Sequence, residues 1–338
     1  MKKLKVGLDN YCLFQKGFMP LEVVKWAYDN GAEGVAFSGY DAGTRENFTS
    51  SYLRDVKDMA NDLGLCLEWG CGQHVPMDME TFRQKDIYIS NRRAVGEACG
   101  LGAGIIRSCS GGLMRWKKDS PSTSSILKET AKELKKQAPI FRDNGVILAI
   151  ETHFEFTTFE LLKLFELCEV EPGDYLGICL DTMNLLTMLE EPVAAAERIL
   201  PWVVTTHIKE GGILQSKTGI VTFPARLGEG VIGIEEIAGM LASTGREINL
   251  SVEDHGGSFH LPVNKKWFLE RFPDLPVPEY NSLLELSQRT AEKMNYSGLK
   301  ITGRDEWPRI CEEKTREDII YLKSLRDRVM NDNRDAFY

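Results

Sequence analysis

The sequence lacks the features that mark several large classes of protein. Its 41 basic residues are outnumbered by 50 acidic residues, giving a formal net charge of −9, whereas nucleic-acid binders and membrane-surface proteins usually carry clustered lysine and arginine. No run approaches the ~18 uncharged apolar residues of a membrane span. The charged N-terminus does not resemble a secretory signal, because Asp9 and Asn10 follow at once in place of an apolar segment. We therefore expect neither a nucleic-acid partner nor a membrane.

Paired cysteine motifs are also missing. The eight cysteines form no Cys-x-x-Cys pair, and several lie in apolar runs, such as Cys179 in the segment 177–180 (GICL). Reduced and mostly buried thiols fit this distribution better than a disulfide framework does. The sequence therefore predicts a cytoplasmic protein.

What the sequence has instead is a regular alternation of short apolar runs and longer amphipathic stretches. The short runs end in polar residues, as parallel strands buried on both faces do. Eight are expected to be strands: Leu4–Leu8, Gly34–Ser38, Cys66–Trp69, Gly104–Arg107, Val146–Glu151, Tyr175–Asp181, Val203–Lys209 and Ile248–Glu253. The helices expected between them are Pro20–Asn30, Ser51–Leu63, Asp86–Ala98, Ser124–Asn144, Thr158–Leu167, Pro192–Leu200 and Gly233–Ser243.

Eight strand–helix units between residues 4 and 254 match the usual size of a (β/α)8 TIM barrel, about 250 residues. A doubly wound open sheet would need a glycine-rich turn after an early strand, and the segment 7–10 (GLDN) offers none. We predict an α/β fold with a barrel catalytic domain over residues 1–258. Residues 259–338, with helices expected at Glu279–Asn295 and Glu313–Met330, would form a C-terminal extension packed on the barrel or at a subunit interface.

Polar residues mark the ends of the last four predicted strands: Glu151, Asp181, His207 and Glu253. In a TIM barrel the chemistry is built at these C-terminal strand ends. One such carboxylate alone usually caps a helix or forms a salt bridge, but three together would repel one another unless a cation lay among them. Three oxygen ligands and one imidazole suit Mn²⁺, Mg²⁺ or Co²⁺. The sequence thus predicts one bound divalent metal ion, with Mn²⁺ as the first expectation.

These strand ends resemble those of the xylose-isomerase-like superfamily of sugar phosphate isomerases and epimerases. The resemblance spans residues 4–255 and rests on Glu151-x-His153, Leu180-Asp181-Thr182, His207-x-Lys209 and Leu227-Gly228-Glu229-Gly230. It implies that the four strand-end residues hold the metal and that Glu151 and Glu253 exchange a proton on opposite sides of a sugar carbon. Many members have histidine where this chain has Asn184, and an amide can bind a sugar hydroxyl but cannot transfer a proton near pH 7.

The tail carries a narrower resemblance. The segments 253–258 (EDHGGS), 261–263 (LPV) and 268–275 (FLERFPDL) are similar to the larger, metal-bearing subunit of bacterial C-glycoside deglycosidases, which pairs with a small β-rich subunit. This resemblance implies a carbon–carbon lyase that separates a 3-keto-sugar from an aromatic, flavonoid-type aglycone by β-elimination, within an oligomer. A sugar isomerase or ketose 3-epimerase is the alternative, and both reactions pass through an enediolate.

His153 is the proton carrier expected in the lyase. It lies two residues beyond Glu151 in an extended strand, so both side chains point to one face, and its ordinary pKa of ~6.5 suits proton transfer. A histidine that only orients a metal ligand is the competing interpretation. The residues expected to bind substrate are Lys209, Arg226, Asn184, Arg107, Trp69 and Trp116. A surface salt bridge is the alternative for each arginine, and plain packing is the alternative for the rings that could wall a flat aglycone.

Two other classes share this fold. A DNA-repair endonuclease that clusters three zinc ions is disfavoured by the net charge and by a total of only five histidines. A non-catalytic partner barrel would usually have lost part of the four-residue group, which is intact here.

Overall fold

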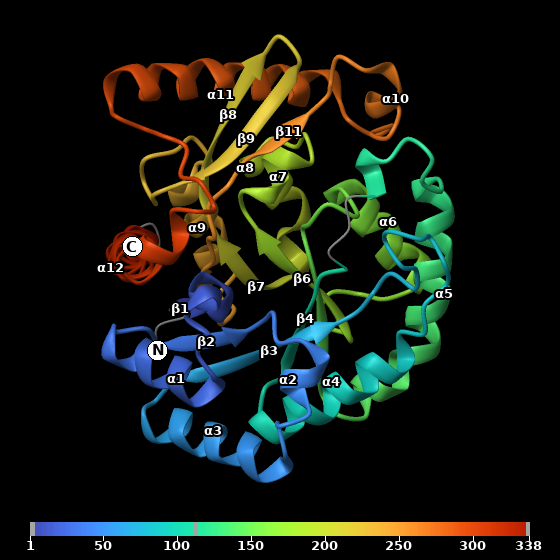
Figure 1. Cartoon of the computed structure of the whole chain (residues 1–338), viewed down its shortest axis with the longest axis vertical. Helices are drawn as coiled ribbons and strands as arrows, with labels where there is room; N and C mark the ends of the chain where they lie inside the picture. The colour runs from blue at the N-terminus through green and yellow to red at the C-terminus, as the bar shows by residue number, and fades with distance from the viewer. Residues whose placement is uncertain (1–3, 111–113, 336–338) are drawn as a thin grey trace.

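Eight parallel strands close into a barrel (Figure 1). The structure, a computed structural model, describes residues 4–110 and 114–335. The barrel strands are β1 (Leu4–Asp9), β2 (Gly34–Phe37), β3 (Cys66–Gly72), β4 (Ile105–Ser108), β5 (Ile147–Glu151), β6 (Leu176–Asp181), β7 (Val203–Ile208) and β10 (Ile248–Val252). The order β1-β10-β7-β6-β5-β4-β3-β2 returns to β1, which pairs with β2. The predicted TIM barrel is confirmed, and each predicted strand agrees with one of these.

Helices surround the barrel as the amphipathic stretches predicted. They are α1 (Pro20–Asp29), α3 (Ser50–Asp62), α4 (Tyr88–Leu101), α5 (Thr123–Arg142), α6 (Thr158–Cys168), α8 (Pro192–Ile199) and α9 (Ile234–Ser243). Pro20 and Pro192 occupy first-turn positions, where the missing amide proton has no intrahelical acceptor to lose. Gly145, with φ 62°, follows α5 in the left-handed conformation that ends many helices. Short helical segments at η1 (Asn10–Lys16), α2 (Ala42–Arg45) and α7 (Asn184–Thr187) lie in the loops after strands.

A second, smaller sheet covers part of the barrel mouth and was not predicted. It consists of β8 (Glu210–Ser216), β9 (Gly219–Ala225) and β11 (Phe259–Leu261), all antiparallel. Helix α11 (Val277–Tyr296) lies along it (Figure 1). Side chains of that helix accept hydrogen bonds from β8, from Ile213 N to Thr290 Oγ1 at 3.2 Å and from Gln215 N to Ser287 Oγ at 2.8 Å. The short helix α10 (Lys266–Leu269) connects β11 to α11.

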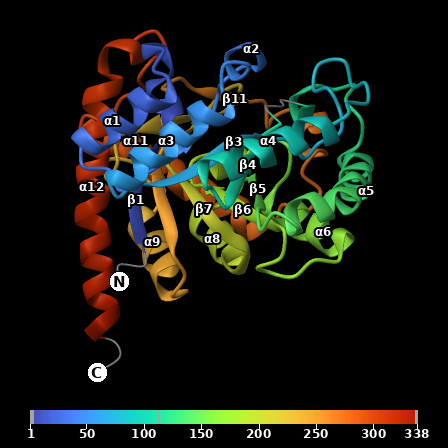
Figure 2. The same cartoon turned by 90° about the horizontal axis from the view of Figure 1, so that it is seen from below.

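The last helix, α12 (Trp307–Asp335), runs along the barrel wall beside β1 and α9 (Figure 2). Trp307 Nε1 donates to Cys12 O at 2.9 Å, and Lys314 pairs with Asp254 just after β10. The segment predicted as one extension from residue 259 thus divides in two. Helix α12 supplies the helix that a barrel needs after its last strand, while β11 and α11 build over the mouth.

Two further observations concern the cysteines and the length of the helices. All eight cysteines are free thiols, and four of them are buried. Among the described residues, no helix is long and apolar enough to cross a membrane.

Candidate functional site

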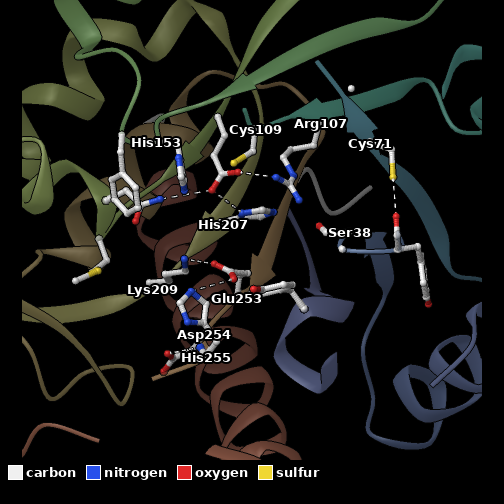
Figure 3. A pocket seen from close by; sticks show the side chains of 18 of the residues that line it. Ser38, Cys71, Arg107, Cys109, His153, His207, Lys209, Glu253, Asp254 and His255 are labelled. Carbon is white, nitrogen blue, oxygen red and sulfur yellow. Dashed lines mark hydrogen bonds and ion pairs between the residues drawn. The ribbon is translucent and has the colours of Figure 1, made fainter. Parts of the chain in front are cut away.

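A cavity of about 720 Å³ opens at the C-terminal ends of the strands. Its wall combines charged and polar groups from the strand ends with aromatic rings from the surrounding loops. The polar residues include Arg107, Glu151, His153, Asn184, His207, Lys209, Glu253 and His255, and the aromatic residues include Tyr11, Tyr40, Phe154 and Phe259. Figure 3 labels Arg107, His153, His207, Lys209, Glu253 and His255 among them. This is the rim at which the sequence predicted the chemistry.

Glu151, Asp181 and His207 form the centre of the site. Each offers a ligand atom within 4.8 Å of the other two, and all three are buried. Strand register produces the arrangement, because Asp181 lies directly opposite His207 on neighbouring parallel strands. His207 Nδ1 is 3.3 Å from Glu151 Oε1. Three of the four predicted metal ligands are therefore brought together around one point.

The fourth predicted metal ligand, Glu253, is linked to this group by the side chain of Lys209. The Lys209 ammonium lies 2.9 Å from Asp181 Oδ2 and also contacts Glu253 Oε2 (Figure 3). Burial alone would lower the pKa of Lys209, but Asp181 and Glu253 raise it well above its ordinary value, so the ammonium is charged at neutral pH. Lys209, predicted as a substrate ligand, is thus the positive charge between two predicted metal ligands.

The donor set fits a divalent cation. Asp181 Oδ2 and Glu253 Oε2 are buried, and among the described residues the Lys209 ammonium is the group that contacts both. Buried carboxylates are costly unless a cation compensates their charge. Oxygen ligands with one imidazole are what Mn²⁺, Mg²⁺ and Co²⁺ accept. Glu151, Asp181 and His207 would hold the ion, with Glu253 completing the set if Lys209 moves aside.

Arg107 and Asn184 both contact Glu151. Arg107 Nη1 donates to Glu151 Oε2 at 2.9 Å, and Asn184 Nδ2 lies 3.5 Å from Glu151 Oε1. Burial raises the pKa of Glu151, but the charges of Arg107 and His207 outweigh it and hold the pKa well below its usual range. Both side chains line the cavity, so they orient the carboxylate and also face whatever the cavity binds.

His153 lines the cavity together with Glu151, but the strand-alternation argument for it was wrong, because β5 ends at Glu151 and His153 lies in the bend that follows. Its Nδ1 is 3.1 Å from Glu155 Oε2, and Cys109 lies beside the same ring (Figure 3). Burial lowers the pKa of His153, but Cys109 and Glu155 raise it well above the ordinary value. The imidazole is thus held between a thiol and a carboxylate at the cavity wall.

Three predicted substrate contacts lie away from the cavity. Trp69 is buried in the barrel wall and donates to Glu97, because β3 continues to Gly72 and Trp69 is not at its end. Trp116 packs against Phe154 and Phe259, behind the rings that line the cavity. Arg226 lies on the surface, where it pairs with Glu317 of α12. The structure corrects the placement of all three.

Several site residues were missed. Asp9 ends β1, and its Oδ2 lies 3.2 Å from His207 Nε2; the strand-end rule that selected Glu151 would have found it. Tyr40 lies in the loop after β2 and Cys109 in the loop after β4, and both line the cavity. The strand-end rule would therefore have pointed to these two loops as well. Arg304 reaches the cavity from the loop before α12, and no local pattern distinguishes it from a surface arginine.

A closed (β/α)8 barrel with a carboxylate–imidazole group at its C-terminal mouth defines the class of barrel enzymes. Within that class, residues 24–270 match the xylose isomerase-like TIM barrel family, and the chain belongs to this family. The match confirms the predicted superfamily and the expectation of an enzyme.

Solved structures agree on the fold. A D-allulose 3-epimerase from Methylomonas sp. aligns with a TM-score of 0.61 and 14% identity, covering 96% of this chain and 99% of that one. An L-ribulose 3-epimerase aligns with a TM-score of 0.55 and 16% identity, covering 87% and 98%. The probable 3-DHS dehydratase AsbF from Bacillus anthracis aligns with a TM-score of 0.56 and 17% identity, covering 80% and 98%. Comparison with the curated proteins gives no match. At such identities the likeness shows the fold alone.

Proposed function

We propose that this protein is a divalent-metal-dependent enzyme that moves a proton beside the carbonyl group of a sugar, as a sugar isomerase or ketose 3-epimerase does. The observation that carries the proposal is the buried Glu151–Asp181–His207 group facing a polar cavity. The epimerases among the structural neighbours support the sugar substrate class. Mn²⁺ is the proposed ion, with Mg²⁺ or Co²⁺ as alternatives that the same donors accept.

The bound ion would supply Lewis acidity toward the sugar oxygens, which makes the adjacent C–H bond more acidic. The protein's own groups would do the rest. Glu151 ends β5 and Glu253 directly follows β10; both line the cavity and would remove and return the proton at one carbon. Lys209 and Arg107 place positive charge beside them, where an oxyanion develops on the substrate. Asn184 would hold a hydroxyl of the sugar through its amide.

A second candidate is the catalytic subunit of a C-glycoside deglycosidase. One observation favours it: the cavity is about 720 Å³ and its lining includes the aromatic rings of Tyr11, Tyr40, Phe154 and Phe259. Pockets of ~300–1,000 Å³ hold drug-sized ligands, so a sugar and a flat aglycone would fit together. In this reaction His153, once its imidazole has lost its proton, would take the proton from C2 of the 3-keto-sugar. The C1–aglycone bond would then break, with the aglycone carbon gaining a proton and the sugar a C1–C2 double bond.

The deglycosidase proposal brings a partner with it. A small β-rich second subunit would join the barrel in an oligomer, and the chain alone would then be weakly active. Native mass spectrometry of the complex purified with the products of neighbouring genes tests this part. A second subunit bound in fixed ratio supports the lyase, and full activity of the lone chain on simple ketoses supports the isomerase.

Solvent exchange tests the shared chemistry. The Mn²⁺-loaded protein is incubated in D₂O with a panel of ketoses and, separately, with a 3-keto-C-glycoside, and products are read by NMR. Deuterium entering a sugar carbon with formation of an epimer or aldose supports isomerisation, while release of the aglycone supports the lyase. Asp181→Asn is the metal-deficient control. Absence of exchange and of release from every substrate, in protein that binds Mn²⁺, contradicts the proposal.

A further inference from the structure

A second group of metal-ligating side chains lies beside the site already described. Cys109, His153 and Glu155 each offer a ligand atom, and these atoms lie within 4.8 Å of one another. Cys109 follows β4, while His153 and Glu155 follow β5. Cys109 and His153 line the cavity and Glu155 is buried behind them. The cluster therefore has protein on one side and the open cavity on the other.

We propose that Cys109, His153 and Glu155 bind a second metal ion, of the thiophilic type represented by Zn²⁺, separate from the ion at Glu151, Asp181 and His207. The ligand chemistry sets the two sites apart. The first group has carboxylates and one imidazole, which suit hard or borderline ions, whereas a thiolate with an imidazole and a carboxylate selects Zn²⁺. Three protein ligands with the fourth position open are typical of zinc sites that bind water or a substrate.

The distances allow an ion with little rearrangement. Zinc binds sulfur at about 2.3 Å and nitrogen or oxygen at about 2.0–2.2 Å in a tetrahedron. Ligand atoms of such a site lie about 3.3–3.8 Å apart, so atoms within 4.8 Å of one another need to close by about 1.5 Å at most. His153 Nδ1 and Glu155 Oε2 are already 3.1 Å apart. On binding, the thiol of Cys109 loses its proton to solvent and the imidazole binds as its neutral form.

The segments that carry the ligands are held in place by other contacts. Ser108 Oγ lies 2.8 Å from His74 Nδ1, and Val75 N donates to Ser110 Oγ at 3.3 Å, on either side of Cys109. Arg115 Nη2 donates to the Glu155 carbonyl at 3.0 Å. Supporting contacts of this kind position ligands before the metal arrives.

The site has a consequence for activity, and this part alone rests on the proposed function. An ion on His153 would occupy the imidazole that moves the proton in the lyase, so Zn²⁺ would inhibit the Mn²⁺-loaded enzyme. The binding itself does not depend on which reaction is correct.

Cobalt titration of the full-length protein tests the binding. Co²⁺ bound to a thiolate gives a charge-transfer absorption in the near ultraviolet that oxygen and nitrogen ligands do not give. We expect the wild type to develop this band and Cys109→Ser to lose it. Cys71→Ser is the matched control, because Cys71 also lines the cavity but lies outside the cluster, and it should keep the band. Glu155→Gln should keep the thiolate but lower Co²⁺ affinity by at least the ~10–100-fold that loss of an outer-shell partner costs, because it removes a ligand carboxylate.

Asp181→Asn separates this inference from the proposed function. In that variant the band should persist while Mn²⁺ binding is lost, because the two sites share no ligand. A wild type without the band, or a band that survives in Cys109→Ser, overturns the second site. If neither the wild type nor any variant binds Mn²⁺ but the cobalt band is present, the proposed function is overturned and the second site stands.

Discussion

Replacing Lys209 by methionine probes the charge balance at the centre of the site. The ammonium lies 2.9 Å from Asp181 Oδ2 and contacts Glu253, and the side chains of all three residues are at most 7% exposed. Methionine keeps much of the aliphatic volume and removes the charge. Two buried carboxylates then face each other without a cation, and leaving buried charge unpaired typically costs ~3–5 kcal/mol.

The expected fall in Tm follows from the size of the chain. With ~2.1 cal/mol/K of unfolding entropy per residue, 338 residues give about 0.7 kcal/mol/K. A loss of ~3–5 kcal/mol therefore lowers Tm by about 4–7 °C in the metal-free protein. The assay belongs at pH 8, because burial raises the pKa of Asp181 to about 6 even with Lys209 beside it. At lower pH, protonation of this carboxyl would hide part of the effect.

Added Mn²⁺ should reverse the loss. An ion present at 100 times its Kd stabilises the folded state by about 2.7 kcal/mol, and the variant should gain more than the wild type because no ammonium competes for Asp181. Scanning calorimetry without and with Mn²⁺ measures the loss of stability and its recovery. Lys163→Met is the control, since Lys163 pairs with Glu166 on the surface, where an ion pair contributes at most ~1 kcal/mol. The reasoning would be refuted if the metal-free Lys209→Met variant were as stable as the wild type. It would also be refuted if Mn²⁺ raised the stability of the two proteins by the same amount.

Three other predictions concern single side chains. His153→Ala should keep Mn²⁺ but lower kcat for aglycone release by ~10²–10⁴-fold; recovery of the rate in excess Mn²⁺ would show that His153 only supports the metal. Burial raises the pKa of Glu190 to about 7, so the folded state holds its proton longer than the unfolded state and stability should fall by up to ~3 kcal/mol as pH rises from about 4.5 to 7. Urea unfolding should show a smaller decline in Glu190→Gln, and an unchanged pH profile would contradict this. Arg226→Ala should leave kcat/KM within about twofold, because a surface change is worth about 0.5 kcal/mol; a tenfold loss in steady-state assays would return Arg226 to the substrate site.

The barrel was predictable because its strands have a strong local signature. Strands such as Leu176–Asp181 are buried along their whole length, and this burial requires a continuous apolar run that is visible in the sequence. The sheet over the mouth was missed because β8 and β9 have a weaker pattern. They are antiparallel strands joined by a tight turn at residues 217–218, and one of them begins with Glu210-Gly211-Gly212, which does not read as a strand.

The site was predictable as far as strand ends determine it. Glu151, Asp181 and His207 come together because parallel strands in register carry their last residues to one rim. The position of Lys209 depends on four side-chain torsions and on the carboxylates around it, which no spacing rule encodes. Trp69 was misplaced for a simpler reason: the predicted strand ended at residue 69, whereas β3 continues to Gly72 and its bulge. An error of three residues moved a core side chain to the rim.

The most direct test of the central claim is a Mn²⁺ titration followed by electron paramagnetic resonance, which detects the free ion. Mn²⁺ prefers oxygen ligands, so it should report the Glu151–Asp181–His207 group and not the thiol-containing cluster. The wild type should bind one Mn²⁺ per chain, and Glu151→Gln and Asp181→Asn should bind none at the same concentrations. Full Mn²⁺ occupancy in both variants, or no binding by the wild type, would contradict a metal centre at these residues.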